Sequence, residues 1–335
     1  MKKLFTSLLL SAVMAAPAMA APKALTKASM CVFDPLGANG SLFNTAKDYG
    51  NSALEWGVDL SPKAYTDEKI ALDDFKAGQC DAVLLTGARA RPFNDFTATI
   101  EAVGAIPNLN VLRTAVKTLA SPKAAKYMKQ GKYEVAGIMP AGPIYVFVRD
   151  KNIDTVEELS GKKIATLDYD EASIYLVNHV GAALVPSNSA NFSGKFNNGS
   201  VDVIYAPAVA YAPLELYHGL GNKGGIIRFV LTYMDFQILI NADKFPKGFG
   251  QKSRSHVVKF FDRVNGFVEK EIEVIDKKYW IDLPQEAMTE YNQMLQQVRI
   301  QLRDKGVYNG KMLTLLRKLR CRENPAAAEC ASKVE

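Results

Sequence analysis

The sequence predicts a two-lobed α/β protein whose chain ends in a helical wrap. Short apolar runs of strand character alternate with amphipathic helical segments from Met30 onward, and the same pattern starts again at Thr155. The chain has 335 residues, which exceeds the usual size of one domain and favours two lobes. After residue 256 the apolar residues recur at helical spacing, so the remainder is expected to be helical.

The first 20 residues have the features of a secretory signal peptide. A basic start at Lys2 and Lys3 precedes the apolar stretch Leu4–Ala16, and small residues surround a cleavage site near Ala20. The apolar stretch is too short to span a bilayer as a helix. We therefore expect export to the bacterial periplasm and, since no cysteine directly follows the cleavage site, no lipid anchor.

The first α/β unit is expected between Met30 and Gly87. Ser41 is a candidate cap for its first helix, Thr66 caps the second helix, and Gly78 ends it. Short strands joined by crossover helices form parallel sheets. In chain order the elements are the strand MCVFDPLG, a helix with Leu42, Phe43, Ala46 and Tyr49 on its apolar face, the strand VDLSPKAY, the helix TDEKIALDDFKAG and the strand CDAVLLTG.

The second unit follows the apolar segment GPIYVFVRD. Thr155 caps a short helix, residues 163–167 form a strand, residues 171–184 a helix, and GSVDVIYAPAV another strand. Residues 224–246 contain two further strand-like runs. Two apolar stripes at helical spacing then predict packing faces rather than cofactor-binding surfaces. These stripes are Val257, Phe260, Phe261, Val264, Phe267, Val268, Ile272 and Ile275, and then Met288, Tyr291, Leu295, Val298 and Leu302.

The charge distribution argues against nucleic acid as a partner. The formal net charge is +6, removal of the two signal lysines leaves about +4, and acidic and basic residues are interspersed. Nucleic-acid or membrane-surface binding needs a basic stripe. The nearest candidate, residues 317–322, is expected to be the solvated face of a last helix.

Four cysteines occur in a chain expected to reach an oxidising compartment, so disulfides are expected. Three pairings are possible. Strands that open at Cys31 and Cys80 can lie side by side, and Cys321 and Cys330 can close a short loop. We therefore favour Cys31–Cys80 and Cys321–Cys330. A zinc site is less favoured because the sequence has neither CxxC spacing nor a nearby histidine.

No arrangement of catalytic residues stands out in the sequence. It has three histidines and lacks the HExxH, GxSxG and Walker motifs. The segment GLGNKG matches GxGxxG but precedes a strand, whereas phosphate binding needs a following helix. Asp168 and Asp170 stand at a helix start, which indicates capping rather than a metal or acid–base site. We expect no enzyme, no metal and no cofactor.

Several segments resemble steps of periplasmic solute-binding proteins. LSGKKI, residues 159–164, matches the Leu-x-Gly-x-Lys-Ile run that enters the second lobe of these proteins. The other matching segments are DDFKAGQCDAVLLTG, VGAALVPSN, KFNNGSVDVIYAP and FQILINADKFPKGF. Their order, and the long helices after the last of them, resemble the binding proteins of the TRAP transporter family over about residues 28–300.

The resemblance implies a periplasmic-binding-protein-like fold with a hinge between two lobes. Lobe 1 would contain residues 21–143 and 235–300, lobe 2 residues 144–234, and residues 301–335 would form a helical tail with a disulfide. It also implies a monomer that closes around a small-molecule solute by hinge motion. The solute would then pass to the membrane subunits of a transporter.

Open α/β sheets bind ligands at the carboxyl ends of their strands, so polar residues there are the candidate ligand contacts. In the first lobe they are Asp34, Asn39, Thr86, Arg89 and Arg91; in the second lobe Asp168, Tyr169, Ser173 and Tyr205; on the crossovers Tyr145 and Asp235.

The residues after the Lys-Ile pair depart from the family pattern. Members commonly carry an arginine there, which clamps a substrate carboxylate through two hydrogen bonds. Here Ala165 and Thr166 occupy these positions. An organic anion would then depend on Arg89 or Arg91, and on family precedent we expect an organic anion.

Other interpretations remain beside this one. A neutral or cationic solute could be held by Asp34 and Asp168, with tyrosine faces contributing cation–π contacts. The rival classes of protein are a periplasmic enzyme of unknown chemistry and an efflux or sensor accessory protein. Accessory proteins built as membrane adaptors have long coiled-coil hairpins, and the sequence shows no sustained heptads.

Overall fold

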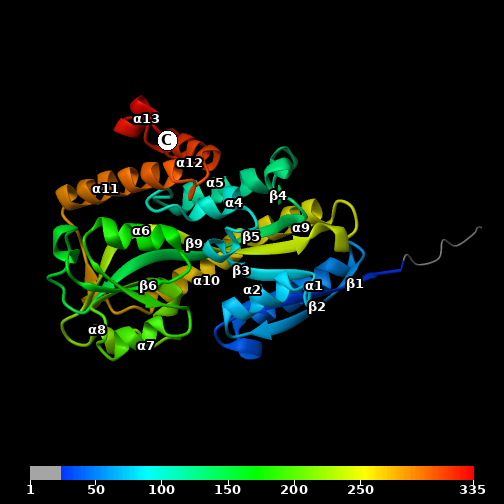
Figure 1. The fold of residues 1–335 in the computed structure, drawn as a ribbon, viewed down its shortest axis with the longest axis horizontal. Helices are drawn as coiled ribbons and strands as arrows, with labels where there is room; N and C mark the ends of the chain where they lie inside the picture. Colours follow the sequence, from blue (N-terminus) through cyan, green and yellow to red (C-terminus); the bar gives the residue numbers. More distant parts are fainter. Residues whose placement is uncertain (1–23) are drawn as a thin grey trace, which may run out of the picture.

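The structure, a computed structural model, describes residues 24–335 (Figure 1). The predicted signal peptide, residues 1–20, lies outside the described residues. Two groups of strands and helices lie at opposite ends of the molecule, one blue to cyan and the other green, and α11 and α12 lie along one side. No helix within residues 24–335 is long and apolar enough to span a membrane.

The elements alternate as the sequence pattern predicts. The strands are β1 (Thr26–Phe33), β2 (Val58–Tyr65), β3 (Ala82–Thr86), β4 (Lys129–Gln130), β5 (Tyr133–Val148), β6 (Lys163–Leu167), β7 (Ala183–Ser187), β8 (Val203–Pro207), β9 (Gly225–Asn241) and β10 (Trp280–Ile281). The α-helices are α1 (Ser41–Leu54), α2 (Glu68–Lys76), α3 (Gly87–Ala90), α4 (Asp95–Ala98), α5 (Leu109–Ala120), α6 (Glu171–His179), α7 (Phe192–Asn197), α8 (Tyr217–Leu220), α9 (Phe249–Val257), α10 (Phe261–Glu273), α11 (Gln285–Asp304), α12 (Gly310–Glu323) and α13 (Ala328–Ser332). The 3₁₀ helices are η1 (Gly37–Asn39), η2 (Thr99–Glu101), η3 (Pro122–Tyr127), η4 (Glu157–Leu159), η5 (Ala208–Ala210), η6 (Ala242–Lys244), η7 (Val258–Phe260) and η8 (Lys277–Tyr279).

Within residues 24–335 the strands form one 10-stranded sheet in the order β2-β1-β3-β9-β5-β8-β6-β7, with β10 beside β9 and β4 beside β5. β1 pairs in parallel with β2 and β3, and β6 pairs in parallel with β7 and β8. The long strands β5 and β9 are antiparallel and join these two parallel groups. This arrangement is the two-lobed α/β fold that the sequence predicts.

Both predicted disulfides are present. Cys31 lies on β1 and Cys80 just before β3, and these strands are direct neighbours in the sheet, which brings the two sulfur atoms together. Cys321 near the end of α12 bonds to Cys330 of α13. The favoured pairings are therefore confirmed.

Local structure differs from the sequence prediction in four places. Gly40 rather than Ser41 is the N-cap of α1, and Ser41 is the first residue of this helix. Residues 224–246 contain one long strand, β9, rather than two runs, because the chain continues without a turn from one lobe to the other. The helix expected over 171–184 ends at His179, and Gly181 with φ +69° leads into β7. Asp67 rather than Thr66 caps α2, since its carboxylate accepts from Lys69 N.

β5 and β9 change register where they cross between the lobes. Shifts occur in their pairing between Pro140 and Gly142 and again between Ile144 and Val146. Gly142 has φ +109°, and a Cβ there would lie 2.7 Å from Val268 Cγ1 of α10. The crossing is therefore irregular and closely covered by a helix, which only glycine permits.

Within the part of the chain that the structure describes, the apolar core consists of one large cluster and two smaller ones. The large cluster joins the first group of strands to the second half of α11 through Leu295, and Phe147 belongs to a smaller cluster around β8. Ile275 and Tyr291 also pack in the smaller clusters. The predicted lobe boundaries stay predictions, and this packing favours placing the segment from Ile275 to Tyr291 with lobe 2.

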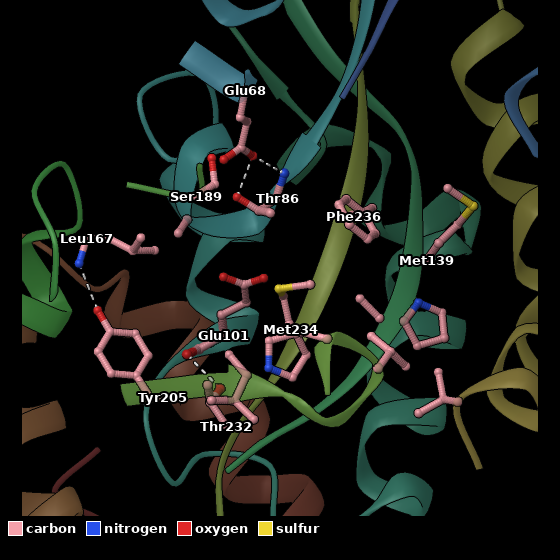
Figure 2. Close-up of a pocket in the computed structure, with 18 of the residues that line it drawn as sticks. Glu68, Thr86, Glu101, Met139, Leu167, Ser189, Tyr205, Thr232, Met234 and Phe236 are labelled. Carbon is pink, nitrogen blue, oxygen red and sulfur yellow. Dashed lines mark hydrogen bonds between the residues drawn. The ribbon is translucent and has the colours of Figure 1, made fainter. Parts of the chain in front are cut away.

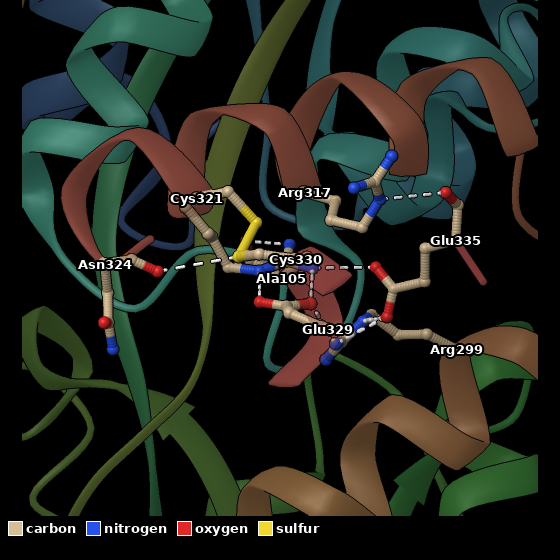
Figure 3. The surroundings of a disulfide bond; sticks show 9 residues. Ala105, Arg299, Arg317, Cys321, Asn324, Glu329, Cys330 and Glu335 are labelled. Carbon is tan, nitrogen blue, oxygen red and sulfur yellow. Dashed lines mark hydrogen bonds and ion pairs between the residues drawn. A yellow bond between two sulfur atoms is a disulfide. The ribbon is translucent and has the colours of Figure 1, made fainter. Parts of the chain in front are cut away.

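The C-terminal tail buries arginines that the sequence analysis expected to be solvated. Arg317 and Arg320 of α12 are each only 7% exposed. Figure 3 shows Arg317 beside Glu335. Arg320 forms ion pairs with Glu329 at 2.5 Å and Glu335 at 2.7 Å, and Arg299 of α11 pairs with Glu335 at 2.6 Å. The expectation of a solvated basic face is therefore wrong for these two arginines.

Candidate functional site

A cavity of about 820 Å³ is lined by residues from both lobes. Its walls come from the long strands β5 and β9, from the ends of β3, β6 and β8, and from α1, α6 and α10. Sites for small molecules commonly have volumes in this range. The carboxyl ends of the parallel strands open into it, as expected for an open α/β sheet.

The cavity lining is mainly apolar. β9 contributes Met234 and Phe236, β5 contributes Met139, and α10 contributes Phe267, which is 58% exposed. Figure 2 shows Met234, Phe236 and Met139 along the strands that cross between the lobes. Methionine side chains adapt to different apolar shapes. The lining thus suits a solute with a substantial hydrocarbon part.

Tyr169 connects the two lobes at the cavity wall. Its hydroxyl donates to Glu68 Oε2 at 3.2 Å, and the guanidinium of Arg89 lies 3.1 Å from its ring centroid. Glu68 also accepts from Thr86 N and Thr86 Oγ1, each at 2.7 Å. Burial nevertheless raises the pKa of Glu68. Residues of α2 and α3 therefore hold a side chain from the loop before α6.

Asp34 lines the cavity, but its carboxylate accepts hydrogen bonds from backbone N–H groups. Its carboxylate accepts from Leu36 N at 2.9 Å and from Phe43 N at 3.0 Å, and so caps the N-terminus of α1. A Cβ on Gly40 would lie 2.0 Å from the Asp34 oxygens. The close approach of this carboxylate to α1 therefore requires glycine at position 40.

Asp170 and Tyr205 also line the cavity and have internal partners. Asp170 accepts from Ala172 N at 3.2 Å and from the Ser173 hydroxyl, which makes it the N-cap of α6. Tyr205 Oη accepts from Leu167 N at 3.0 Å (Figure 2). The capping role expected at this helix start is confirmed for Asp170.

Glu101 lines the cavity, and the buried carboxyl group of Asp235 lies behind the lining beside it. Figure 2 shows the Glu101 carboxylate between Thr86 and Met234, pointing into the open space. Asp235 is fully buried, and its backbone N donates to Glu101 Oε1 at 2.8 Å. A Cβ on Gly87 would lie 2.8 Å from Glu101 Oε1 and 3.0 Å from Asp235 Oδ2. Both carboxyl groups therefore pack against the same glycine.

Burial favours the protonated form of this carboxyl pair. Burial raises the pKa of Asp235 to about 7. Burial first, and then the charge of Asp235, raise the pKa of Glu101 well above its ordinary value. Arg91 and the nearby Gln237 offset this only in part, and neither Asp235 oxygen meets hydrogen-bond geometry with a donor among the described residues. Two adjacent carboxyl groups in a buried site favour a shared proton.

The structure brings six of the predicted ligand contacts to the cavity and places five elsewhere. The lining includes Asp34, Thr86, Arg91, Tyr169, Ser173 and Tyr205, whereas Asn39, Arg89, Tyr145, Asp168 and Asp235 are outside it.

The residues outside the lining have visible reasons for their positions. Asn39 and Asp168 are exposed, Arg89 lies under Tyr169, and Tyr145 packs against Trp280 at 5.0 Å between ring centroids. Asp235 lies buried beside Glu101. For Tyr145 and Asp235, the alternation of side chains along β5 and β9 decides which face each residue takes.

Sequence reasoning missed Glu68, Glu101 and Asp170 as lining carboxylates. Asp170 was visible in the acidic loop before α6, but it was interpreted only as a cap. Glu68 and Glu101 lie in helical segments without a motif, so only their burial in the fold could identify them. Residues 24–335 contain no cluster of three or more His, Cys, Asp or Glu side chains arranged to hold a metal ion.

Comparison with known proteins places this geometry in a family. The family model described as "Solute-binding protein AdeT 1/2" matches residues 52–335, which includes the disulfide-closed tail. The chain belongs to the AdeT1/2 solute-binding protein family. "Probable solute-binding protein AdeT1" from Acinetobacter baumannii is 46% identical over 300 residues, which cover 90% of this chain and 99% of the relative.

Solved structures share the fold of this AdeT1/2 family member at low sequence identity. A TRAP periplasmic solute-binding protein from Ralstonia eutropha with bound (S)-2-acetolactate has a TM-score of 0.71 at 12% identity, covering 89% of this chain and 99% of that one. A second, from Desulfovibrio salexigens with bound orotic acid, has a TM-score of 0.70 at 13% identity over the same shares. The predicted two-lobed fold and the TRAP resemblance are confirmed.

Proposed function

We propose that this solute-binding protein acts in the periplasm as a monomer, encloses one small solute between its lobes, and delivers it to the membrane subunits of a transporter without catalysing a reaction. The observation that carries the proposal is the cavity of about 820 Å³ that residues of both lobes line together. A ligand that contacts both lobes stabilises the closed arrangement through contacts absent from the open one.

Closure follows from the way the lobes are joined. The long strands β5 and β9 are the crossing segments, and their register shifts near Gly142 supply the irregular backbone on which a hinge turns. Tyr169 then closes onto Glu68 and Arg89 from the other lobe. A bound solute that contacts both lobes keeps this contact between Tyr169, Glu68 and Arg89 formed.

The solute class expected from family precedent is an organic anion. Arg91 lines the cavity and supports that class, and the structural neighbours hold orotic acid and acetolactate. Arg89 is less available to bind an anion than Arg91 is, because its guanidinium is stacked on Tyr169 and lies 3.7 Å from Glu68 Oε2. Ala165 lines the cavity at the position where the clamping arginine is expected.

The test combines native mass spectrometry with small-angle X-ray scattering on protein purified from its own host. We expect a co-purified small molecule in stoichiometric amount and a smaller radius of gyration than that of protein stripped by partial unfolding and refolding. Tyr169→Ala should weaken binding about tenfold, since a cation–π contact and one hydrogen bond together contribute about 1–2 kcal/mol.

Tyr217→Ala is the matched control, because this half-exposed tyrosine of α8 is not among the cavity-lining residues. A host-purified protein that carries no small molecule, and that keeps its dimensions with every solute of a charge-balanced panel, would contradict the proposed function. Turnover of a bound solute would establish the rival class, a periplasmic enzyme.

A further inference from the structure

The carboxylates around the cavity differ in the hydrogen-bond donors and ion partners that they have. Asp34 and Asp170 accept backbone N–H groups at helix starts, and Glu68 accepts from Thr86 and Tyr169. Glu101 accepts from Asp235 N, and among the described residues no lysine or arginine forms an ion pair with Glu101. Glu101 therefore has capacity for an external partner. Asp48 and Glu271 also line the cavity without an ion pair within residues 24–335, but Glu101 differs from them because it packs beside a buried carboxyl group, that of Asp235.

The buried carboxyl group of Asp235 makes it more favourable for Glu101 to bind a positively charged partner. Its side chain is fully buried, carries two oxygens without a donor in the described part of the chain, and packs against Gly87 beside Glu101. A buried polar group without a partner is unfavourable unless something else compensates it. A positive charge at Glu101 would compensate both carboxyl groups at once.

The lining cations are already engaged or lie at the surface. Arg91 Nη1 donates to Val307 O at 3.0 Å, and its guanidinium lies 5.3 Å from the Tyr308 ring centroid. Arg263 is exposed on α10. Beside Glu101, Figure 2 shows Met234, Thr86 and Thr232, and Phe236 continues the apolar lining along β9.

We infer that Glu101, supported by Asp235, binds the positively charged group of an apolar solute, such as a protonated amine whose hydrocarbon part lies along Met234 and Phe236. This inference rests on the proposed solute-binding function, and it replaces the organic anion expected from family precedent with a cationic substrate class. A short contact between an ammonium group and a carboxylate in an apolar cavity is stronger than the same contact in water. Met234 and Phe236 remove the hydrocarbon part of the solute from water.

Binding of a cation changes the protonation of the carboxyl pair. The proton shared by Glu101 and Asp235 is released to the buffer as the ammonium group takes its place. The groups that face the pair are Arg91 at the end of α3, Asp170 before α6 and Gln237 on β9. Because the pKa of Asp235 is raised to about 7, affinity for a cation increases as the pH rises through neutrality.

The probes are phenylbutylamine, phenylbutanol and phenylbutyrate, which share a phenylalkyl chain and differ in charge. Titration calorimetry of the full chain at about pH 6 and about pH 8 measures their dissociation constants, and neither the amine nor the carboxylate probe changes its ionisation between these values. We expect phenylbutylamine to bind best and to bind about tenfold more tightly at the higher pH. Two buffers with different ionisation enthalpies should reveal proton release.

Glu101→Gln keeps the size of the side chain and removes its charge. We expect it to weaken phenylbutylamine binding about tenfold or more and to leave phenylbutanol binding unchanged. Arg91→Gln is the second variant, and it should retain or strengthen phenylbutylamine binding because it removes a positive charge near the pair. Thermal unfolding of both variants checks that the cavity is still formed.

Three binding results, besides a failure of all three probes to bind, would overturn the inference. One is tighter binding of phenylbutyrate than of the amine, lost in Arg91→Gln. Another is amine binding that Glu101→Gln leaves unchanged. The third is binding of the amine that weakens as the pH rises. If none of the three probes binds while a solute from the host still compacts the protein, the substrate class is wrong and the solute-binding function stands. If no solute compacts the protein, the proposed function itself fails.

Discussion

At the scale of single residues, a position can require glycine because a carboxylate occupies the place where a Cβ atom would be. Gly40 has φ −78°, which any residue adopts, so its backbone does not require glycine. The requirement comes from Asp34, whose oxygens occupy the place where a Cβ would be. The same carboxylate caps α1, and α1 lines the cavity, so the cap also positions part of the site.

Gly40→Ala should therefore destabilise the protein by about 1–3 kcal/mol, since Asp34 must give up its hydrogen bonds to Leu36 N and Phe43 N. Gly266→Ala on α10 is the control, because a Cβ there meets open space and alanine favours the helix. Urea unfolding measures both. Equal stability of Gly40→Ala and the parent chain would show that Asp34 is not fixed in this position.

At the scale of elements, the tail is held by buried charges as well as by a disulfide. Glu335, the last residue, accepts from Arg299 and Arg320 through its side chain and from Arg317 through its backbone (Figure 3). These contacts fasten α12 to α11. The Cys321–Cys330 bond closes a loop with a sequence separation of 9 residues and so keeps Glu329 near Arg320.

Glu335→Ala should lower the free energy of unfolding by about 3–5 kcal/mol, because it leaves buried arginines short of a partner. Glu290→Ala serves as the control, since Glu290 is exposed on α11 and forms no ion pair among residues 24–335. Thermal and urea unfolding under non-reducing conditions compare the two variants. A Glu335→Ala protein as stable as the Glu290→Ala protein would show that the C-terminus is loosely attached.

At the scale of the whole molecule, the site between the lobes makes stability depend on pH. The folded protein raises the pKa of Asp235 from 3.8 to about 7 and also raises that of Glu101. Between these values the folded state binds more protons than the unfolded chain, so the contribution to stability is complete below about pH 4 and is lost as the pH rises through 7.

Asp235→Asn should remove much of this dependence and stabilise the protein near pH 8 by an amount on the order of 2–3 kcal/mol. Urea unfolding at several pH values between about 4 and about 8 measures the slope for the variant, for the parent chain, and for Asp243→Asn, a control at an exposed carboxylate. A parent protein that becomes more stable across this range would mean that the pair is not protonated in the fold.

The sequence by itself determined the elements, the two-lobed α/β class and the disulfides. Alternating apolar runs and helical spacing are local signals, and Cys31 and Cys80 follow the strand order that such units adopt. Family resemblance supplied the hinge and the general place of the site. Asp34 and Thr86 reached the cavity because they stand at strand ends, whereas Tyr205 lines it from the middle of β8.

Only the tertiary structure decided which charges line the cavity. Arg89 and Arg91 are two residues apart, yet Arg89 lies under Tyr169 and Arg91 lines the cavity. Glu101 and Asp235 are far apart in the chain and become adjacent only when η2 packs against β9. The physical reason is that burial, strand alternation and pairing between lobes arise from contacts between distant segments, and no local pattern encodes the free energy of a charge in that surrounding.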